Sequence, residues 1–241
     1  MHRTADRVGR RAILDVVVTV LSALGVGILL VQFGGASPLG SAAAVISGLT
    51  LVAVGVLNIV RRRPLFSTPA DRVTLSRAVL GGGCATVVVL ALLGVVPPRS
   101  WWLLLLAAPA VLLDAVDGAV ARRTGTASEP GSRLDMETDA ALLVVFSIPL
   151  AMVLGPWVLA VGLMRYVFVA ASRFRPALRA PLDYSRFRRI VAAVQSVAMV
   201  VALVPVVPVP VATVVVAVAL LLLTISFARD VVTLERRSRS H

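Results

Sequence analysis

The sequence predicts an all-α membrane protein, a polytopic bundle of about eight transmembrane helices. Of its 241 residues, 59% are hydrophobic and only 15% are charged, whereas about a quarter of the residues in soluble domains are charged. The apolar residues form long blocks, and about 20 helical residues are needed to cross a hydrocarbon layer ~30 Å thick. Clusters of Gly, Pro or Arg separate these blocks, as expected for connections between helices.

Eight apolar segments follow one another along the chain, and each is long enough to be interpreted as a membrane-crossing helix. They span residues 12–33, 41–60, 72–96, 101–122, 133–154, 156–175, 187–204 and 210–229. The stretch from Arg61 to Pro69 is a visible seam, with two segments before it and six after it. We therefore predict an N-terminal extension of two transmembrane helices at residues 1–63 and a six-helix domain at residues 64–241.

The arginines predict the orientation. All 24 basic residues are arginine, and 23 of them lie in or beside the two termini and the second, fourth and sixth connections; Arg99 alone lies on the other connections. The positive-inside rule places the 23-arginine side, and both termini, in the cytoplasm. We therefore expect a plasma-membrane protein among lipids, without a nucleic-acid partner despite its net charge of +12.

The other composition data exclude several kinds of chemistry. Cys84 is the one cysteine, so an intrachain disulfide is excluded. The two histidines, His2 and His241, stand at the termini, which argues against zinc and histidine acid–base chemistry.

Acidic residues are concentrated where they are costly. Six of the 12 acidic residues fall within residues 114–139. Asp114 and Asp117 are spaced i, i+3, and Asp135 and Asp139 are spaced i, i+4, so each pair shares one helix face. An ionised aspartate inside a bilayer costs at least ~2.5 kcal/mol, which calls for a neutralising partner. Divalent cations that prefer oxygen ligands suit this role, Mg²⁺ first and Mn²⁺ second.

The spacing of these residues resembles a family signature. The chain contains Asp114-x2-Asp117-Gly118-x2-Ala121-Arg122-x8-Gly131-x3-Asp135-x3-Asp139, which is similar to the motif of the CDP-alcohol phosphotransferase family. The resemblance extends from about Thr68 to the last helix, the six-helix core of that family. It implies a homodimeric membrane enzyme that releases CMP from a CDP-linked substrate.

The resemblance also implies roles for individual residues. The four aspartates would hold two metal ions, and Asp139 would also be the base that deprotonates the acceptor hydroxyl. The CDP moiety would be bound by residues of the signature and by the start of the first core helix, namely Gly118, Ala121, Arg122, Gly131, Asp71 and Thr74. The family often has Asn where this chain has Ala70 or Asp71.

A second group of arginines predicts how the acceptor is bound. Arg165 lies about halfway along the sixth apolar segment, and an arginine at that depth is read as functional. Arg173 and Arg175 follow toward the cytoplasm, and guanidinium groups match phosphate well. We therefore expect a polyol or polyol-phosphate acceptor, with glycerol 3-phosphate ahead of inositol phosphate.

Two enzyme functions and one other function compete at this point. The first is transfer of a phosphatidyl group from CDP-diacylglycerol to the small acceptor. The second keeps the chemistry but uses a CDP-linked small alcohol as donor and a lipid as acceptor. The third is an ion-coupled transporter, which predicts ionisable groups near the midplane on broken helices. The aspartates instead flank one cytoplasmic connection, and this favours the enzyme. For residues 1–60 we expect a role in stability, assembly or lipid access.

Overall fold

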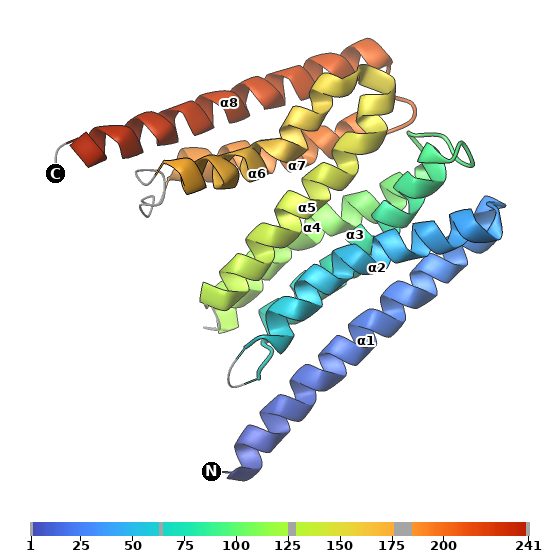
Figure 1. The fold of residues 1–241 in the computed structure, drawn as a ribbon, viewed down its shortest axis with the longest axis vertical. Coiled ribbons are helices and arrows are strands. Elements are labelled where there is room, and N and C mark those ends of the chain that lie inside the picture. The colour runs from blue at the N-terminus through green and yellow to red at the C-terminus, as the bar shows by residue number, and fades with distance from the viewer. Residues whose placement is uncertain (1, 63–64, 125–128, 176–184, 240–241) are drawn as a thin grey trace.

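The computed structural model is a bundle of long helices that run back and forth (Figure 1). It describes residues 2–62, 65–124, 129–175 and 185–239, but not the side chains of residues 2–8, 115–124, 129–130, 132–133 and 237–239. The elements are α1 (His2–Gly34), α2 (Pro38–Val60), α3 (Pro69–Leu92), α4 (Trp101–Thr124), α5 (Glu129–Leu154), the 3₁₀ helix η1 (Pro156–Val158), α6 (Leu159–Phe174), α7 (Arg186–Leu203) and α8 (Val209–Arg239). The described residues contain no strand, and the predicted all-α bundle is confirmed.

Six of the described helical stretches are long and apolar enough to cross a membrane. They are Gly9–Gly34, Pro38–Val60, Pro69–Leu92, Leu134–Leu154, Pro156–Phe174 and Val209–Arg236. In α4 the described apolar stretch is shorter, Trp101–Asp114, and α7 has only 18 residues. The described helices therefore make the chain an integral membrane protein, as predicted, and α7 has weaker span character than its apolar segment suggested.

Local sequence explains where α2 and α3 begin. Ser37 caps α2 by accepting a hydrogen bond from the Gly40 amide at 3.2 Å, and Pro38 follows as the first helical residue. Thr68 caps α3 in the same manner, again followed by a proline. A proline suits the first turn, where its missing N–H would have no partner within the helix.

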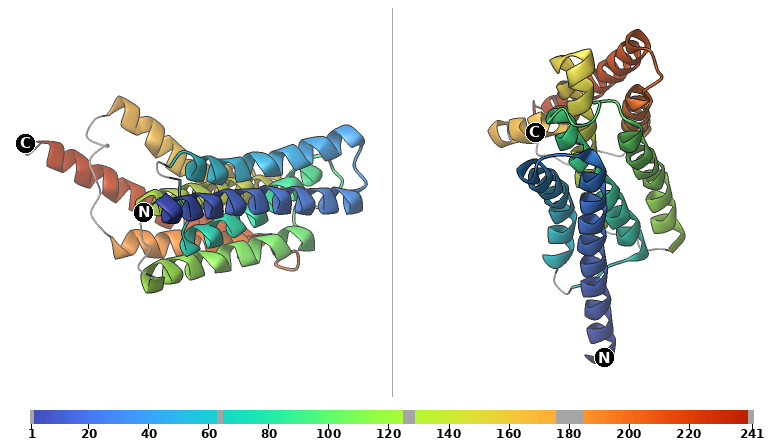
Figure 2. Two further views of the ribbon diagram at one scale, coloured as in Figure 1. Left: turned by 90° about the horizontal axis from the view of Figure 1, so that it is seen from below. Right: turned by 90° about the vertical axis from the view of Figure 1, so that its right-hand side faces the viewer.

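Helix α3 is the centre of the bundle. It packs against α1, α2, α4 and α5, and it is the most buried of the candidate spans. Helices α1 and α2 lie on one side of it and α6, α7 and α8 lie toward the other (Figures 1 and 2). The backbones of α2 and α3 touch, because a Cβ atom on Gly48 would lie 2.6 Å from the Gly82 carbonyl oxygen.

The two ends of the bundle differ. Both termini and the ends of α2, α4 and α6 lie toward one end, while α1, α3, α5 and α7 finish toward the other (Figure 1). At that second end Arg99, between α3 and α4, donates hydrogen bonds to the carbonyls of Val204 and Val207, the second at 2.6 Å. A guanidinium group thus joins two connections that are about a hundred residues apart.

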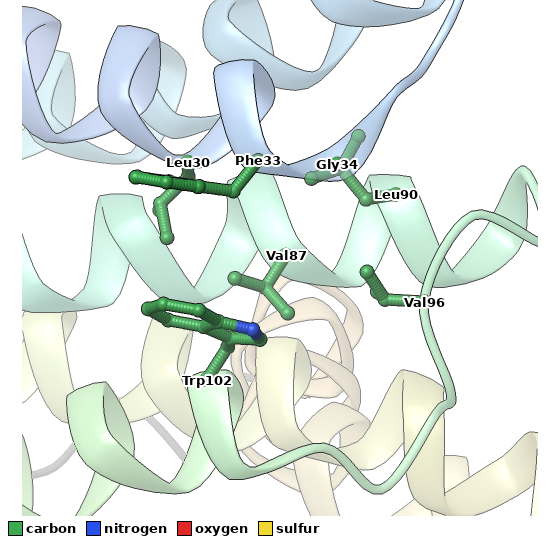
Figure 3. A pocket seen from close by; sticks show the side chains of 7 residues that line it. All are labelled: Leu30, Phe33, Gly34, Val87, Leu90, Val96 and Trp102. Carbon is green, nitrogen blue, oxygen red and sulfur yellow. The ribbon is translucent and has the colours of Figure 1, made fainter.

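A small apolar pocket also lies at this second end. Leu30, Phe33 and Gly34 of α1, Val87 and Leu90 of α3, Val96, and Trp102 of α4 line it (Figure 3). The rings of Phe33 and Trp102 stack with their centroids 5.9 Å apart. Apart from the indole N–H, the lining side chains carry no polar group, so the pocket offers no catalytic chemistry.

Candidate active site

Three carboxylates from two helices meet at the first end of the bundle. Asp114 comes from α4, and Asp135 and Asp139 come from α5, one turn apart on the same face. Each offers one oxygen atom, and these atoms all lie within 4.8 Å of one another. Their side chains are 37%, 38% and 39% exposed, respectively. The cluster is therefore open to a ligand.

The three carboxylates share one arginine. The Arg77 guanidinium, from the third turn of α3, lies 3.1 Å from Asp114 Oδ1 and 2.5 Å from Asp135 Oδ1, and it also contacts Asp139. Its Nε donates to the carbonyl of Ala110 at 3.2 Å. The Arg77 side chain is only 1% exposed, so its charge is held beneath the carboxylates rather than in solvent. With all four groups ionised, three negative charges face one positive charge, and a negative excess remains.

This arrangement suits a divalent cation. Hard cations such as Mg²⁺ and Mn²⁺ prefer carboxylate oxygens, and three such oxygens converge here on one partly exposed point. The negative excess beside Arg77 supplies the electrostatic attraction. Asp117, the fourth predicted ligand, lies on α4, but its side chain is outside the described part of the structure.

The predicted CDP-binding residues divide into three groups. Gly118, Ala121 and Arg122 continue α4 beyond Asp114, but their side chains also lie outside the described part. Gly131 lies in the first turn of α5, and buried Thr74 lies one turn before Arg77 on α3, with its hydroxyl 3.3 Å from the Ala70 carbonyl. The carboxylate of Asp71 is engaged by Arg62 and Thr68, so a contact with CDP stays a prediction for that residue.

The predicted acceptor residues do not all come together. Arg165, on α6, reaches across to α5, where its Nη1 lies 3.5 Å from the sulfur of Met136, the neighbour of Asp135. Exposed Arg173 lies in the last turn of α6, and Arg175 follows it and pairs with Glu235 of α8. Arg165 is thus placed next to α5, the helix that carries two of the clustered carboxylates.

Arg77 is not among the site residues expected from the sequence, where it counts among the arginines that indicate the cytoplasmic side. A signal was present. Arg77 lies inside the apolar segment 72–96, and a charged residue within such a run indicates a functional group with a partner. That partner could not be named from spacing, because it comes from two other helices.

The fold and the site together define a class, an integral membrane protein with a cation-attracting carboxylate cluster at one end of its helical core. The family follows from a direct comparison, because the model of the CDP-alcohol phosphatidyltransferase family matches residues 67–226. The chain belongs to this family. Its members depend on Mg²⁺ or Mn²⁺ and use CDP-alcohol donors and alcohol acceptors. No match was found among curated proteins or among solved structures.

Proposed function

We propose that this protein transfers a phosphatidyl group from CDP-diacylglycerol to a polyol or polyol-phosphate acceptor and releases CMP. The observation that carries the proposal is the convergence of Asp114, Asp135 and Asp139 on one partly exposed point above Arg77. Family membership supports transfer from a CDP-alcohol. The lipid environment of the helices suits a lipid-linked donor such as CDP-diacylglycerol, and the experiment below separates this donor from the reverse arrangement, a CDP-linked small alcohol with a lipid acceptor.

Two Mg²⁺ ions, with Mn²⁺ as a substitute, would be held by the four aspartates, Asp114, Asp117, Asp135 and Asp139. Bound there, they would neutralise charge on the pyrophosphate and on the departing CMP. The described carboxylates support this assignment through their convergence and their hard oxygen donors.

The chain's own residues would perform the remaining chemistry. An acceptor hydroxyl oxygen forms a bond to the phosphatidyl phosphorus, the bond from that phosphorus to the CMP oxygen breaks, and the hydroxyl proton passes to Asp139. Arg77 would hold the carboxylate of Asp139 in position for this transfer, since the two groups are in contact. Small residues at Gly118 and Ala121 would let the nucleotide approach α4, with Arg122, Gly131 and Thr74 as further contacts.

The acceptor proposed is a phosphorylated polyol, with glycerol 3-phosphate ahead of inositol phosphate. Arg165 supports it, because its guanidinium reaches the neighbour of Asp135 and would meet an acceptor phosphate beside the carboxylates. Arg173 would add a second cation near the end of α6. Arg175 would add a third cation once it released Glu235, with which it is paired.

The orientation is proposed from charge. The end of the bundle that carries the carboxylates also carries both termini (Figure 1), and 23 of the 24 arginines were assigned to this side. We therefore propose that the site faces the cytoplasm from the plasma membrane. Homodimer formation is proposed by analogy with the family.

The decisive experiment measures CMP release by the purified protein in liposomes that contain CDP-diacylglycerol. Each reaction receives one acceptor: glycerol 3-phosphate, inositol phosphate, glycerol or inositol. We expect CMP release with Mg²⁺ or Mn²⁺, loss of it in chelator, and the fastest turnover with a phosphorylated acceptor. CMP release from a CDP-linked small alcohol and diacylglycerol, but not from CDP-diacylglycerol, would show that the donor is assigned wrongly. A preference for unphosphorylated glycerol or inositol would contradict the assignment of a phosphorylated acceptor but not the CMP-releasing reaction.

A further inference from the structure

The family match begins at residue 67, so α1 and α2 lie outside it, yet both are tied to the first turn of α3. We propose that the buried Arg62–Asp71 ion pair is a positioning contact for the active site. Through this pair, the N-terminal helices would hold α3 in the register that brings Arg77 to the carboxylates. The inference rests on the proposed function, because it concerns the same metal-binding carboxylates.

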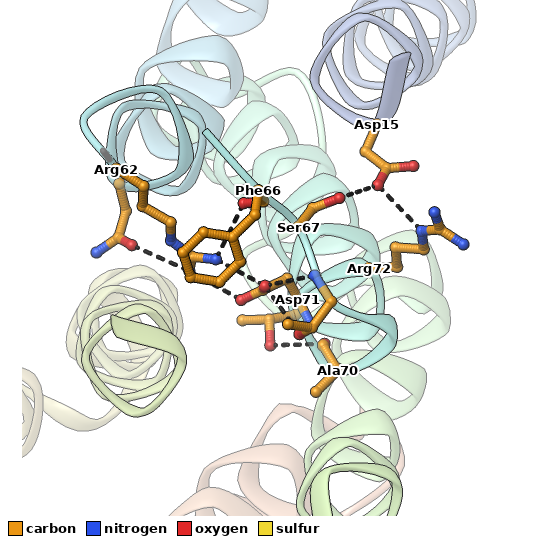
Figure 4. A network of polar contacts seen from close by, with 10 residues as sticks. Asp15, Arg62, Phe66, Ser67, Ala70, Asp71 and Arg72 are labelled. Atoms are coloured by element: carbon orange, nitrogen blue, oxygen red, sulfur yellow. Dashed lines mark hydrogen bonds and ion pairs between the residues drawn. The ribbon is translucent and has the colours of Figure 1, made fainter. Parts of the chain in front are cut away.

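The pair has the geometry of a rigid joint. Arg62 Nη1 lies 2.7 Å from Asp71 Oδ2, and Arg62 Nη2 lies 2.9 Å from Asp71 Oδ1, so both ends of the guanidinium grip both carboxylate oxygens (Figure 4). The two side chains are only 4% and 1% exposed. The Phe66 ring covers the guanidinium, with its centroid 4.8 Å from Arg62 Cζ. A two-point contact fixes orientation as well as distance, and burial protects it from screening by salt.

Asp71 is also part of the start of α3. Its Oδ2 accepts hydrogen bonds from the amide and the hydroxyl of Thr68, both at 2.8 Å, and its own amide donates to Thr68 Oγ1 at 3.1 Å. This is a capping box, in which two backbone N–H groups of the first turn find partners. The Asp71 carboxylate therefore stabilises the start of α3 and also binds Arg62, the second residue after the end of α2.

A weaker tie comes from α1. Asp15 accepts hydrogen bonds from the Ser67 hydroxyl and, at 3.0 Å, from Arg72 Nε (Figure 4). The Arg72 side chain is 51% exposed, so solvent screens this contact and it holds α3 less firmly. The buried pair is therefore the contact that sets the position, and the Asp15 contacts supplement it.

Two fixed points determine how α3 lies on α2. One is the Arg62–Asp71 pair, and the other is the touching backbones of Gly48 and Gly82. Arg77 lies between them, six residues after Asp71, which is about 9 Å along a helix. A shift of the first turn would move Arg77 relative to Asp114 and Asp135, which belong to different helices. Loss of the pair should therefore change the carboxylate site as well as stability.

The test measures Mn²⁺ binding by electron paramagnetic resonance on the full-length protein in lipid nanodiscs, together with its melting temperature. Arg62→Gln removes the pair and keeps most of the side-chain volume. Arg61→Gln is the matched control, because it removes the same charge from the neighbouring exposed position. We expect Arg62→Gln to weaken Mn²⁺ binding about tenfold, the lower end for loss of a residue that orients metal ligands. Arg61→Gln should leave Mn²⁺ binding unchanged.

Arg62→Lys provides the conservative variant and also covers the case in which Arg62→Gln does not fold. It keeps the charge but loses the two-point grip, so Mn²⁺ binding should fall between that of the wild type and that of Arg62→Gln, or below the wild type where only Arg62→Lys folds. A lowered melting temperature with unchanged Mn²⁺ affinity in the folded variants would overturn the positioning role and leave a purely structural one. Failure of the wild type to bind Mn²⁺ would instead contradict the proposed metal-dependent function, and this inference with it.

Discussion

Two arginine–carboxylate sites lie within three turns of α3, and they are built differently. At the first turn, Arg62 faces one carboxylate, Asp71, and both side chains are almost completely buried. At the third turn, Arg77 is equally buried but faces three carboxylates that are each more than a third exposed. The first site is balanced in charge and closed, whereas the second has a negative excess and is open. This difference separates an ion pair that holds helices together from one that prepares a binding site.

The largest effect is expected when a carboxylate is removed from the open site. Asp135→Ala should lower CMP release by about 10³-fold, the upper range for loss of an electrostatic contact in the transition state. The protein should remain folded in the membrane, because this side chain is partly exposed rather than packed in the core. Initial rates and a melting curve check both statements.

Glu137→Ala is the control for this prediction. Glu137 lies on the same helix between the two clustered aspartates, but it is exposed and outside the convergent group. It should retain activity. Robust CMP release by the Asp135→Ala protein would contradict the interpretation of the open site as a metal site.

Arg77→Gln should increase the negative excess of the open site, because it removes the positive charge that the three carboxylates share. Removing one partner of a buried ion pair costs about 3–5 kcal/mol. We expect Arg77→Gln to lower the free energy of unfolding by about 3 kcal/mol, the lower end of this range, because the three carboxylates are partly solvated. Adding Mn²⁺ should restore part of the lost stability, because the cation can neutralise the same carboxylate oxygens. Thermal unfolding of the wild type and the variant, in chelator and in Mn²⁺, measures this change in stability. An equal loss of stability in both conditions would indicate that Arg77 contributes only by packing.

Arg165→Ala tests whether the open site extends toward α6. The acceptor KM should rise about 10- to 100-fold, which corresponds to a charge-assisted contact of about 1.5–3 kcal/mol. The donor KM should change much less, because we assign the CDP contacts to α3, α4 and the start of α5. Arg186→Ala removes an exposed arginine from α7 and serves as the control. A rise in donor KM alone would assign Arg165 to the CDP phosphates.

The smallest effect is expected at the exposed edge of the closed site. Arg72→Gln removes the contact with Asp15, in which the arginine is half exposed. Such surface pairs contribute about 0.2–1 kcal/mol, so stability should fall by no more than that and Mn²⁺ affinity should stay constant. A tenfold change in Mn²⁺ affinity would show that α1, and not only Arg62, sets the position of α3.

The sequence predicted the open site better than the closed one, for a physical reason. Asp135 and Asp139 are one turn apart, so helical periodicity alone puts them on one face. Asp114 joined them through the family signature and through the short connection between α4 and α5. Arg62 lies in the connection after α2 and Asp71 lies on α3, and their pairing depends on how the chain turns between them. From sequence, Asp71 was therefore interpreted as a nucleotide contact and Arg62 as part of the cytoplasmic charge.

The helices themselves followed from composition, with one difference in detail. Long apolar blocks predicted the eight α-helices of the described residues, because a lipid environment leaves few alternatives to a helix with internal hydrogen bonds. Hydropathy gave a weaker basis for α7, which begins with Arg186, Arg188 and Arg189. The apolar stretch of α7 is short, and the helix packs against α4, α5 and α8.

The two hydrogen bonds from Arg99 to the carbonyls of Val204 and Val207, here called the Arg99 clamp, determine which of these positions can vary in sequence. Arg99 binds the carbonyl groups of Val204 and Val207 and makes no use of their side chains. Because every amino acid supplies a carbonyl, the connection between α7 and α8 can change its side chains and keep the clamp, whereas residue 99 must supply the guanidinium. A mutational scan should therefore find strict selection at one position of the clamp and tolerance at the two positions that it grips.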